Sequence, residues 1–458
     1  MAWIPIREGS EYRVVRRIST SRSVFMLVSL CYILTFMFFL QTSPPTEISG
    51  SVQNPSRLII TLTIIFALSP ALWVPLLVSK PSKLIYILLY FILIIPSIVS
   101  PIYIVEMSTV SFLRMYTIIL ASFIIIASCF VLPVYDVKIK QFSLIQPYSD
   151  VLLYLSALLF VILLSSQVGI KHLYALPSLT DVYNQRSIFK ETMGLYTGDI
   201  VRIFMYSIFP FSLAKGLNDS KIRLISVGVI GQIIIYSVGG FRSPLAIIIG
   251  VAGLYFLMQR LKMLNAVSIG IVFIVITGTA YISEVLFGAT MIKGLLFGRL
   301  LFAPGLASTV YFDFFTTAER APDTFFPYFW WLFESTYTTP VPAIVGQEYV
   351  PGSYLNGSYI SNGFATFGYL GVILYSFMIS FSFWVYDVAA NNRNMIPYIC
   401  IPGVIIAITN TSPAAWLNFT VIIAPAQVIF SGASTLRMFT YGSFIILIIL
   451  NFLLVSKQ

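Results

Sequence analysis

Residues 233–250 read IIIYSVGGFRSPLAIIIG, in which two glycines, an arginine and a proline interrupt one of the most apolar regions of the chain. The apolar runs on both sides predict membrane-crossing helices, and the glycines allow a tight reversal between them. Pro244 suits the first turn of the returning helix, where its missing N–H needs no partner. Arg242 would cost roughly 2.5–3.5 kcal/mol in the middle of a span. We therefore expect it at a membrane surface, where it either snorkels to water or binds a ligand.

The whole chain has the composition of an integral membrane protein. Of its 458 residues, 58% are hydrophobic and only 10% are charged, and the mean hydropathy is +0.92. This leaves too little polar surface to cover a soluble globule. The apolar runs have the length of helices that cross about 30 Å of hydrocarbon, and they lack the alternation typical of an outer-membrane β-barrel. We predict an all-α, multi-pass bundle of about 11–13 spans that forms a single integral-membrane domain over residues 1–458.

Apolar runs and their breaks predict where the helices lie. The expected spans run near residues 23–40, 58–79, 84–104, 115–134, 151–166, 199–214, 224–240, 244–259, 265–287, 364–386, 396–410 and 438–455. The stretch 410–430 is either a further span or a re-entrant segment, which leaves the total open.

The basic residues set the orientation of these spans. With the arginine-rich N-terminus in the cytoplasm, most lysines and arginines fall on the cytoplasmic side, as the positive-inside rule requires. The formal charge of +10 then needs no nucleic-acid partner. The arginines followed by an apolar run at residues 24–40 resemble the order of a secretory signal peptide. No small-residue cleavage site follows, so we expect this run to be retained as the first helix.

Two outer connections are much longer than the others and cover about residues 167–198 and 288–362. Loops beyond about 15 residues in a compact protein usually carry function or are disordered. Both connections are rich in aromatic residues and low in net charge, which disfavours disorder. Residues 311–337, YFDFFTTAERAPDTFFPYFWWLFESTY, are typical either of an aromatic belt at the membrane interface or of a groove that packs rings on sugars.

Arg202 and Arg299 pose the same problem as Arg242. Each lies near the outer end of an apolar segment, and Lys293 precedes Arg299 by nearly two helical turns. Scattered in lipid without adjacent carboxylates, these cations would be costly, whereas around a cavity they would form an anion site. A guanidinium binds phosphate oxygens bidentately and stays charged, which suits a diphosphate.

Other sequence motifs typical of catalytic or metal-binding sites are missing. The single histidine, His172, stands at the start of the first long connection, where a surface position is more common than a catalytic one. Cys31, Cys129 and Cys400 fall inside apolar runs and behave as small hydrophobic residues. No P-loop, G-x-S-x-G or H-E-x-x-H motif occurs, and the outer carboxylates show no paired D-x-D spacing. We predict neither a metal nor a cofactor.

Four segments carry a resemblance to a known family. They are VRIFMYSIFPF (201–211), the hairpin GGFRSPLAI (239–247), GRLLFAPGLASTVYFDFF (298–315) and NGSYISNGFATFGYLGVILYS (356–376). With these segments and the order of its spans, the sequence resembles the O-antigen polymerases, the Wzy-type bacterial polymerases of lipid-linked oligosaccharide repeat units.

The resemblance implies a GT-C-like glycosyltransferase of the bacterial inner membrane that works at the periplasmic face, with a cytoplasmic N-terminus. Its donor and acceptor would be glycans linked to undecaprenyl diphosphate, and a chain-length regulator protein would be a partner. Four basic residues would hold the donor's diphosphate: Arg202, Arg242, Arg299 and Lys293. Three residues are candidates to orient or deprotonate the acceptor: Asp313, Glu334 and Tyr311.

One family signature is absent, and rival functions remain. Arg186 is followed by Gly198 one position too late for the R-x10-G pattern of some members, which puts a two-loop catch-and-release scheme in doubt. An O-antigen ligase would have similar topology, but ligases carry a functional histidine in the late loop, and this loop has none. A flippase would be expected to show repeat-related halves and central charges. No feature of the sequence points to a purely structural subunit.

Overall fold

The computed structural model describes residues 21–42, 54–132, 148–174, 185, 189, 192, 195–260, 264–322, 336–351, 353–390 and 395–410. Within these residues the chain is helical apart from short connections and one isolated bridge between Leu77 and Asn265. The predicted all-α fold is confirmed for this part of the chain. The expected span at 438–455 lies outside it.

Ten helices of the described chain are long and apolar enough to cross a membrane, as a multi-pass membrane protein requires. Shorter apolar helices cover Arg57–Leu72 and Ile396–Asn410. The ten candidate spans are Arg22–Thr42, Pro81–Ile104, Thr109–Phe130, Asp150–Val168, Ile200–Asp219, Ile222–Gly239, Ser243–Arg260, Ala266–Phe287, Gly294–Thr317 and Tyr359–Val388.

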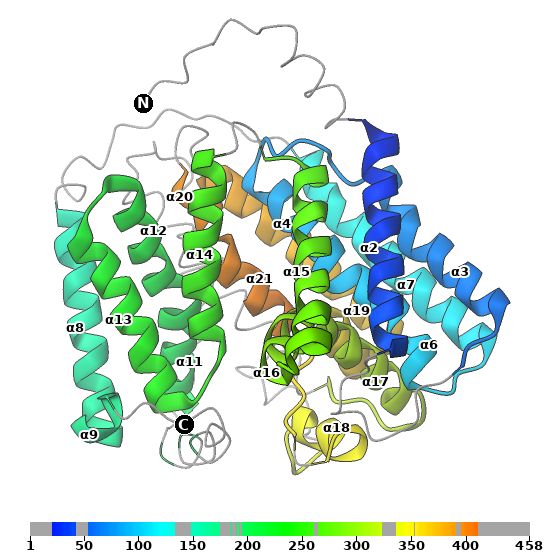
Figure 1. Cartoon of the computed structure of the whole chain (residues 1–458). Helices are drawn as coiled ribbons and strands as arrows, with labels where there is room; N and C mark the ends of the chain where they lie inside the picture. The colour runs from blue at the N-terminus through cyan, green and yellow to red at the C-terminus, as the bar shows by residue number, and fades with distance from the viewer. Residues whose placement is uncertain are drawn as a thin grey trace, which may run out of the picture.

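The helices form two bundles, which stand side by side in Figure 1. The first bundle contains α8 (Ser149–Val168), α9 (Ile170–Tyr174), α11 (Leu195–Ile203), η5 (Phe204–Ile208), α12 (Phe209–Asp219), α13 (Ile222–Gly239) and α14 (Ser243–Arg260). The second begins with α2 (Arg22–Thr42), α3 (Arg57–Leu68), η1 (Ser69–Leu72), α4 (Pro81–Leu89), η2 (Tyr90–Ile94), α5 (Ile95–Val99), α6 (Pro101–Ile104), α7 (Thr109–Ala127) and η3 (Ser128–Phe130). It is completed by α15 (Ala266–Phe287), α16 (Thr290–Lys293), η6 (Gly294–Phe302), α17 (Ala303–Thr317), α18 (Val341–Tyr349) and α19 (Tyr359–Ala389).

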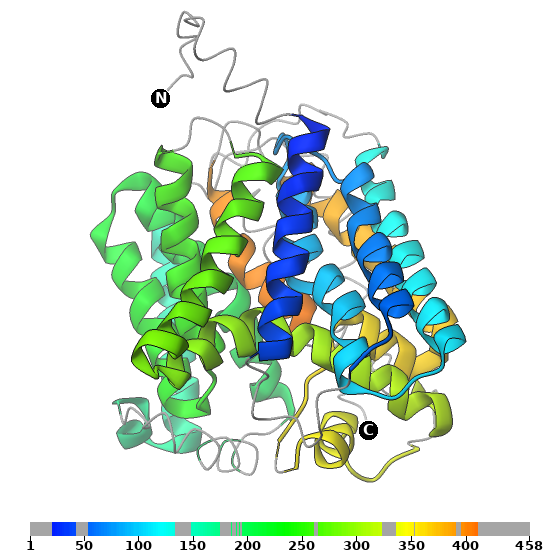
Figure 2. The same cartoon turned by 45° about the vertical axis from the view of Figure 1, so that its right-hand side comes forward.

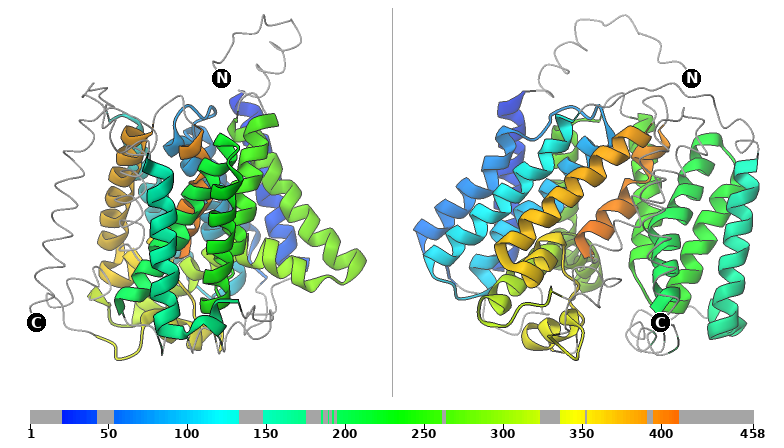
Figure 3. Two further views of the ribbon diagram at one scale, coloured as in Figure 1. Left: turned by 90° about the vertical axis from the view of Figure 1, so that its left-hand side faces the viewer. Right: turned by 180° about the vertical axis from the view of Figure 1, so that it is seen from behind.

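Two short helices pack between the bundles. α21 (Ile401–Asn410) lies against α4 and α19 of the second bundle and against α14 and η5 of the first. α20 (Ile396–Ile399) contacts α4, α12 and α14. Figure 3 shows the same arrangement from behind, with α21 crossing between the first bundle and the diagonal α19. Among the described elements, α20 and α21 therefore form the main packed connection between the two bundles.

One end of the molecule gathers the elements of both long connections. α9, α16 and α18 lie at this end, and the first turn of α2 lies at the opposite end (Figures 1 and 2). We call it the cap end. The turn between α13 and α14 also lies here (Figure 1). This agrees with the predicted threading, in which these connections share one side.

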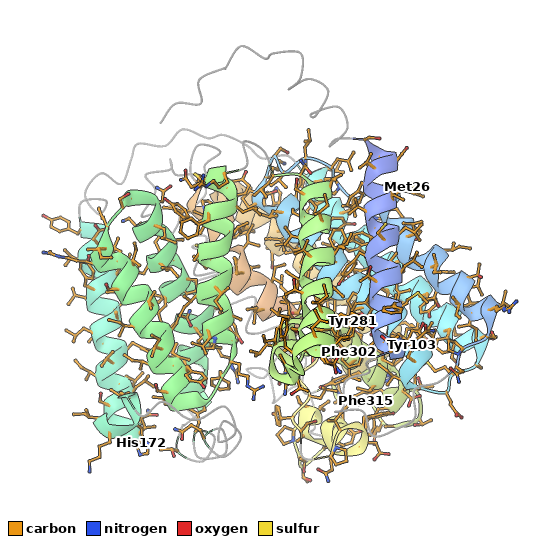
Figure 4. All side chains as sticks on the ribbon, viewed as in Figure 1. Met26, Tyr103, His172, Tyr281, Phe302 and Phe315 are labelled. Atoms are coloured by element: carbon orange, nitrogen blue, oxygen red, sulfur yellow. The ribbon has the colours of Figure 1, made fainter. Side chains whose placement is uncertain are left out.

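In its described residues, the connection expected at 288–362 is largely helical. It contains α16, η6, α17 and α18, and the segment Gly294–Thr317, which the sequence analysis assigned to a loop, is itself long and apolar enough to span. Because α16 precedes it and α18 follows it at the same end (Figure 2), the segment is entered from the cap end and left toward it. Phe302 and Phe315, labelled in Figure 4, are 2% and 1% exposed, so these aromatic side chains belong to the protein core.

A break divides α19 near its start. Phe367 (φ −132°, ψ 21°) and Gly368 (φ 64°, ψ −140°) leave the helical conformation, and the second of these suits glycine. The Arg320 guanidinium donates to the Phe364 carbonyl at 2.8 Å, and the Ala321 N–H donates to the Ala365 carbonyl at 2.9 Å. The chain after α17 therefore supplies the donors that the broken helix cannot supply itself.

The break folds the two parts of α19 tightly together. A Cβ atom on Gly371 would lie far inside contact distance of the Gly363 carbonyl oxygen, so glycine is required where the two parts meet.

We predict that Gly371→Ala destabilises the protein by about 1–3 kcal/mol, the usual cost of overpacking. Thermal unfolding of the purified protein in detergent measures the change. Gly253→Ala in α14 is the matched control, since a Cβ there meets nothing within 4 Å and alanine is the better helix former. Equal melting temperatures for G371A and the wild type would contradict the close approach.

Candidate functional site

Three π-helical segments occur among the described helices, and each is followed by a proline two residues after its last residue. η2 precedes Pro96, η5 precedes Pro210 and η6 precedes Pro304. A proline has no N–H for the carbonyl four residues earlier, which here lies inside the π-helical segment, so the hydrogen-bond register shifts locally. π-Helical turns occur frequently at functional sites.

Two of these segments carry predicted site residues. Arg202 lies two residues before η5 and is exposed, and Arg299 lies within η6 and is half-buried. The prolines therefore shape the helices that position both arginines.

The hairpin tip is built as the sequence predicts. Gly240 takes the left-handed conformation (φ 59°, ψ 21°), its N–H donates to the Tyr236 carbonyl at 2.9 Å, and α14 starts at Ser243 with Pro244 in its first turn. Arg242 follows directly and is half-buried. The tip thus fixes the backbone from which the Arg242 side chain starts.

The first long connection packs onto this tip. The Phe189 ring meets the Phe241 ring edge-on at 5.3 Å, and the Gln185 side chain donates to the Val238 carbonyl at 3.2 Å. His172 is exposed on α9, at the edge of the cap end (Figure 4), and is a surface residue as expected.

Arg202 and Arg242 lie just before two elements that contact each other, η5 and α14. The Ser243 hydroxyl donates to the Met205 sulfur at 3.5 Å. Ser243 follows Arg242 directly, and Met205 is about one helical turn beyond Arg202. The structure therefore brings these two predicted site residues into one region.

A small cap covers the cap end of α17. The α18 cap comprises residues 336–351 and 353–358, and it is closed by a bond from the Leu355 N–H to the Pro342 carbonyl (2.9 Å). The Tyr311 hydroxyl, on α17, donates to the Leu355 carbonyl at 3.0 Å. The Tyr349 hydroxyl donates to Asp313 Oδ2 at 2.5 Å. Both bonds fasten the α18 cap to α17.

The predicted acceptor-side residues Tyr311 and Asp313 therefore both form a hydrogen bond with the α18 cap. Tyr311 is fully buried, and its hydroxyl holds a backbone carbonyl, which is a structural role. Asp313 is half-buried, and one of its oxygens accepts from Tyr349. Burial, followed by the bond to Asp313, raises the pKa of Tyr349, so the phenol stays a donor. Glu334 lies outside the described residues.

Tyr354, in the α18 cap, is a half-buried tyrosine that the sequence did not single out. Burial raises its pKa, and the positive charge of Arg202 opposes this rise. The signal in the sequence is slight: a tyrosine between turn-forming residues in PGSYLNGS (351–358).

Lys293 and Arg299 belong to the other bundle. The Lys293 ammonium is 2.7 Å from Glu284 Oε1 and 5.9 Å from the centre of the Phe39 ring, and the side chain is largely buried. η6, which carries Arg299, packs chiefly on α15, α16, α17 and η2. Glu284 thus balances the charge of Lys293, which weakens the reasoning that made this lysine a diphosphate ligand.

We predict that Lys293→Met destabilises the protein by about 1–3 kcal/mol, because it leaves Glu284 without its cation in a mostly buried place. Thermal unfolding should show a lowered midpoint that the double variant K293M/E284L recovers. If the protein is a glycosyltransferase, its transfer activity tells the roles apart: a structural pair leaves the double variant active, whereas a stable but inactive double variant would make Lys293 a ligand.

The Ser243–Met205 contact brings the α13–α14 turn and the α11–η5 segment together, and the arginines Arg202 and Arg242 lie within three residues of it. Compared with known proteins, the chain matches no family model, no curated protein and no solved structure. What the region does is therefore inferred from its residues.

Proposed function

We propose that this protein is an O-antigen polymerase, a metal-independent glycosyltransferase of the bacterial inner membrane. It transfers a glycan chain from undecaprenyl diphosphate to the non-reducing end of a lipid-linked repeat unit at the periplasmic face. The sequence resemblance at the hairpin and in the 298–315 and 356–376 segments first suggests this activity. A GT-C-like architecture and a cytoplasmic N-terminus are part of the proposal.

The observation that carries the proposal is the neighbourhood of Arg202 and Arg242. Arg202 stands three residues before Met205 and Arg242 one residue before Ser243, and the contact between Met205 and Ser243 brings their backbones into one region. Guanidinium groups pair with phosphate oxygens through two parallel hydrogen bonds and keep their charge at any physiological pH. A diphosphate would offset the cost of holding both cations next to an apolar interior.

The proposed transfer reaction requires, above all, stabilisation of the negative charge on the leaving diphosphate. The acceptor hydroxyl oxygen forms a bond to the anomeric carbon of the donor while the bond from that carbon to the diphosphate oxygen breaks. Negative charge grows on the leaving diphosphate, where Arg202 and Arg242 would stabilise it. The hydroxyl proton passes to a base, and Asp313 is the candidate of suitable type in the described chain. The bond from Tyr349 would orient that carboxylate.

We predict that Arg242→Ala abolishes long-chain polymer while the protein still inserts into the membrane, and that Arg242→Lys restores part of it because charge returns without the bidentate fork. The measurement is the lipopolysaccharide ladder in a polymerase-deficient strain that carries each variant. Loss of one charged contact of this kind costs about 10²–10³-fold in rate.

Arg260→Ala is the matched control, since Arg260 lies at the opposite end of the same helix α14. It should leave the ladder unchanged. Purified protein offered lipid A core or a lipid-linked repeat unit as acceptor separates a polymerase from a ligase. Normal chain length in R242A, at wild-type protein levels, would remove the basis of the proposal.

A further inference from the structure

Gln232 in α13 is a fully buried amide whose Nε2 atom donates to the Met205 carbonyl of η5 at 2.6 Å. We propose that Gln232 is a positioning residue: by holding the π-helical register of η5, it sets the direction of Arg202 toward the anion of the candidate site. The inference rests on the proposed function for the identity of that anion. It adds a residue that acts on the site through the backbone.

The Met205 carbonyl needs a side-chain donor because of Pro210. In a π-helix each N–H donates to the carbonyl five residues earlier, and the Phe209 N–H donates in this way to the Phe204 carbonyl. The next such bond would run from residue 210 to the Met205 carbonyl, but proline has no N–H. Gln232 supplies the donor that this position lacks, so the carbonyl is not left unpaired in an apolar interior.

The second bundle contains the same repair at η2. The Ile95 N–H donates to the Tyr90 carbonyl, and Pro96 removes the next π-helical bond, which would reach the Phe91 carbonyl. The Tyr32 hydroxyl, from α2, donates to the Phe91 carbonyl at 3.1 Å. Two different side chains thus donate to the same position of two π-helical segments, five residues before the proline. The recurrence ties the bond to the π-helical register, and it provides a matched control in the other bundle.

Gly228 and Gly231 bring α13 against the segment that Gln232 holds. A Cβ on Gly231 would collide with the Phe209 ring, and a Cβ on Gly228 would lie 2.8 Å from the Phe209 carbonyl oxygen. The Oε1 atom of Gln232 has no hydrogen-bond partner in the described part of the chain. Burial of such an acceptor is unfavourable. Stability alone therefore does not explain an amide at this position, whereas the need for a donor does.

The register of η5 determines where Arg202 points. One extra residue in a helical turn rotates the parts before and after it by about 100° relative to each other. In the observed register, the Met205 sulfur accepts from the Ser243 hydroxyl at 3.5 Å, and Ser243 follows Arg242. Arg202 stands three residues before Met205, so the same register sets the direction in which its side chain leaves the helix. Gln232 thereby fixes Arg202 relative to the α13–α14 turn.

The first test compares Gln232→Met with Tyr32→Phe in the purified full-length protein in lipid nanodiscs. Each variant removes one side-chain donor to a π-helical carbonyl, so both should lower the melting temperature. Only Q232M should also weaken the binding of farnesyl diphosphate. It should lower kcat/KM for glycan transfer about 100-fold, as expected when a group that binds the substrate is misplaced by about 1 Å. Equal binding and transfer in Q232M and Y32F would overturn the inference.

A double-mutant cycle shows whether Gln232 acts through Arg202. In Arg202→Ala the side chain to be positioned is absent, so Q232M should cause little further loss of farnesyl diphosphate binding. A purely structural role predicts that Q232M weakens binding by the same factor in the wild type and in R202A. That result would contradict a positioning role.

Pro210→Ala tests why the bond is needed. An N–H at position 210 lets the backbone satisfy the Met205 carbonyl, so Q232M should lower the melting temperature less in P210A than in the wild type. Equal losses in the two backgrounds would overturn the inference. If Q232M alone does not fold, P210A/Q232M should still fold, and its failure to do so would count against the inference in the same way.

The proposed function and this inference fail in different ways. If Q232M binds farnesyl diphosphate like Y32F while R242A lacks polymer, Gln232 is not a positioning residue and the proposed function stands. If Q232M loses this binding and Y32F keeps it, but the wild-type protein extends no lipid-linked repeat unit, the positioning role stands and the proposed function is wrong.

Discussion

Backbone hydrogen bonding in an apolar interior is the constraint on which this structure depends. No water is present there to satisfy a carbonyl that a helix leaves free, so each interruption has to be repaired within the protein. At the break in α19, Arg320 and Ala321 donate to the carbonyls of Phe364 and Ala365. The Arg320 guanidinium also lies 4.3 Å from the centre of the Phe364 ring, which favours the same position. A charged side chain here supplies a hydrogen bond that the broken helix lacks.

The same constraint affects the arginines of the candidate site in another way than it affects Arg320. Pro210 and Pro304 shift the hydrogen-bond register of η5 and η6, and Arg202 and Arg299 lie beside or inside those segments. At the hairpin, Gly240 ends α13 in the left-handed conformation and places Arg242 at the tip. Arg320 thus serves the backbone, whereas Arg202 and Arg242 lie where the chain bends toward one end of the molecule. Sequence context alone does not separate these two uses of arginine.

The all-α fold, the approximate positions of most helices and the hairpin could be predicted from the sequence. They depend on local hydropathy and on the positions of glycine and proline. The helices within 294–317 did not follow from the sequence, since Gly294, Gly298, Gly305 and Arg299 interrupt an otherwise apolar run. The Lys293–Glu284 pair and the bond from Tyr349 to Asp313 join residues 9 and 36 positions apart. Such pairings depend on how helices pack, and a single sequence carries almost no signal for them.

If the protein is the proposed polymerase, its division into two bundles bears on how a growing polymer leaves. The cations Arg202 and Arg242 come from the first bundle, while the α18 cap and Asp313 of α17, to which Tyr349 bonds it, come from the second. A site divided in this way separates charge binding from coverage of the acceptor. If the cap were permanently closed, a lengthening glycan would have to thread beneath it after each transfer. The proposed polymerase would therefore need the cap to open between transfers.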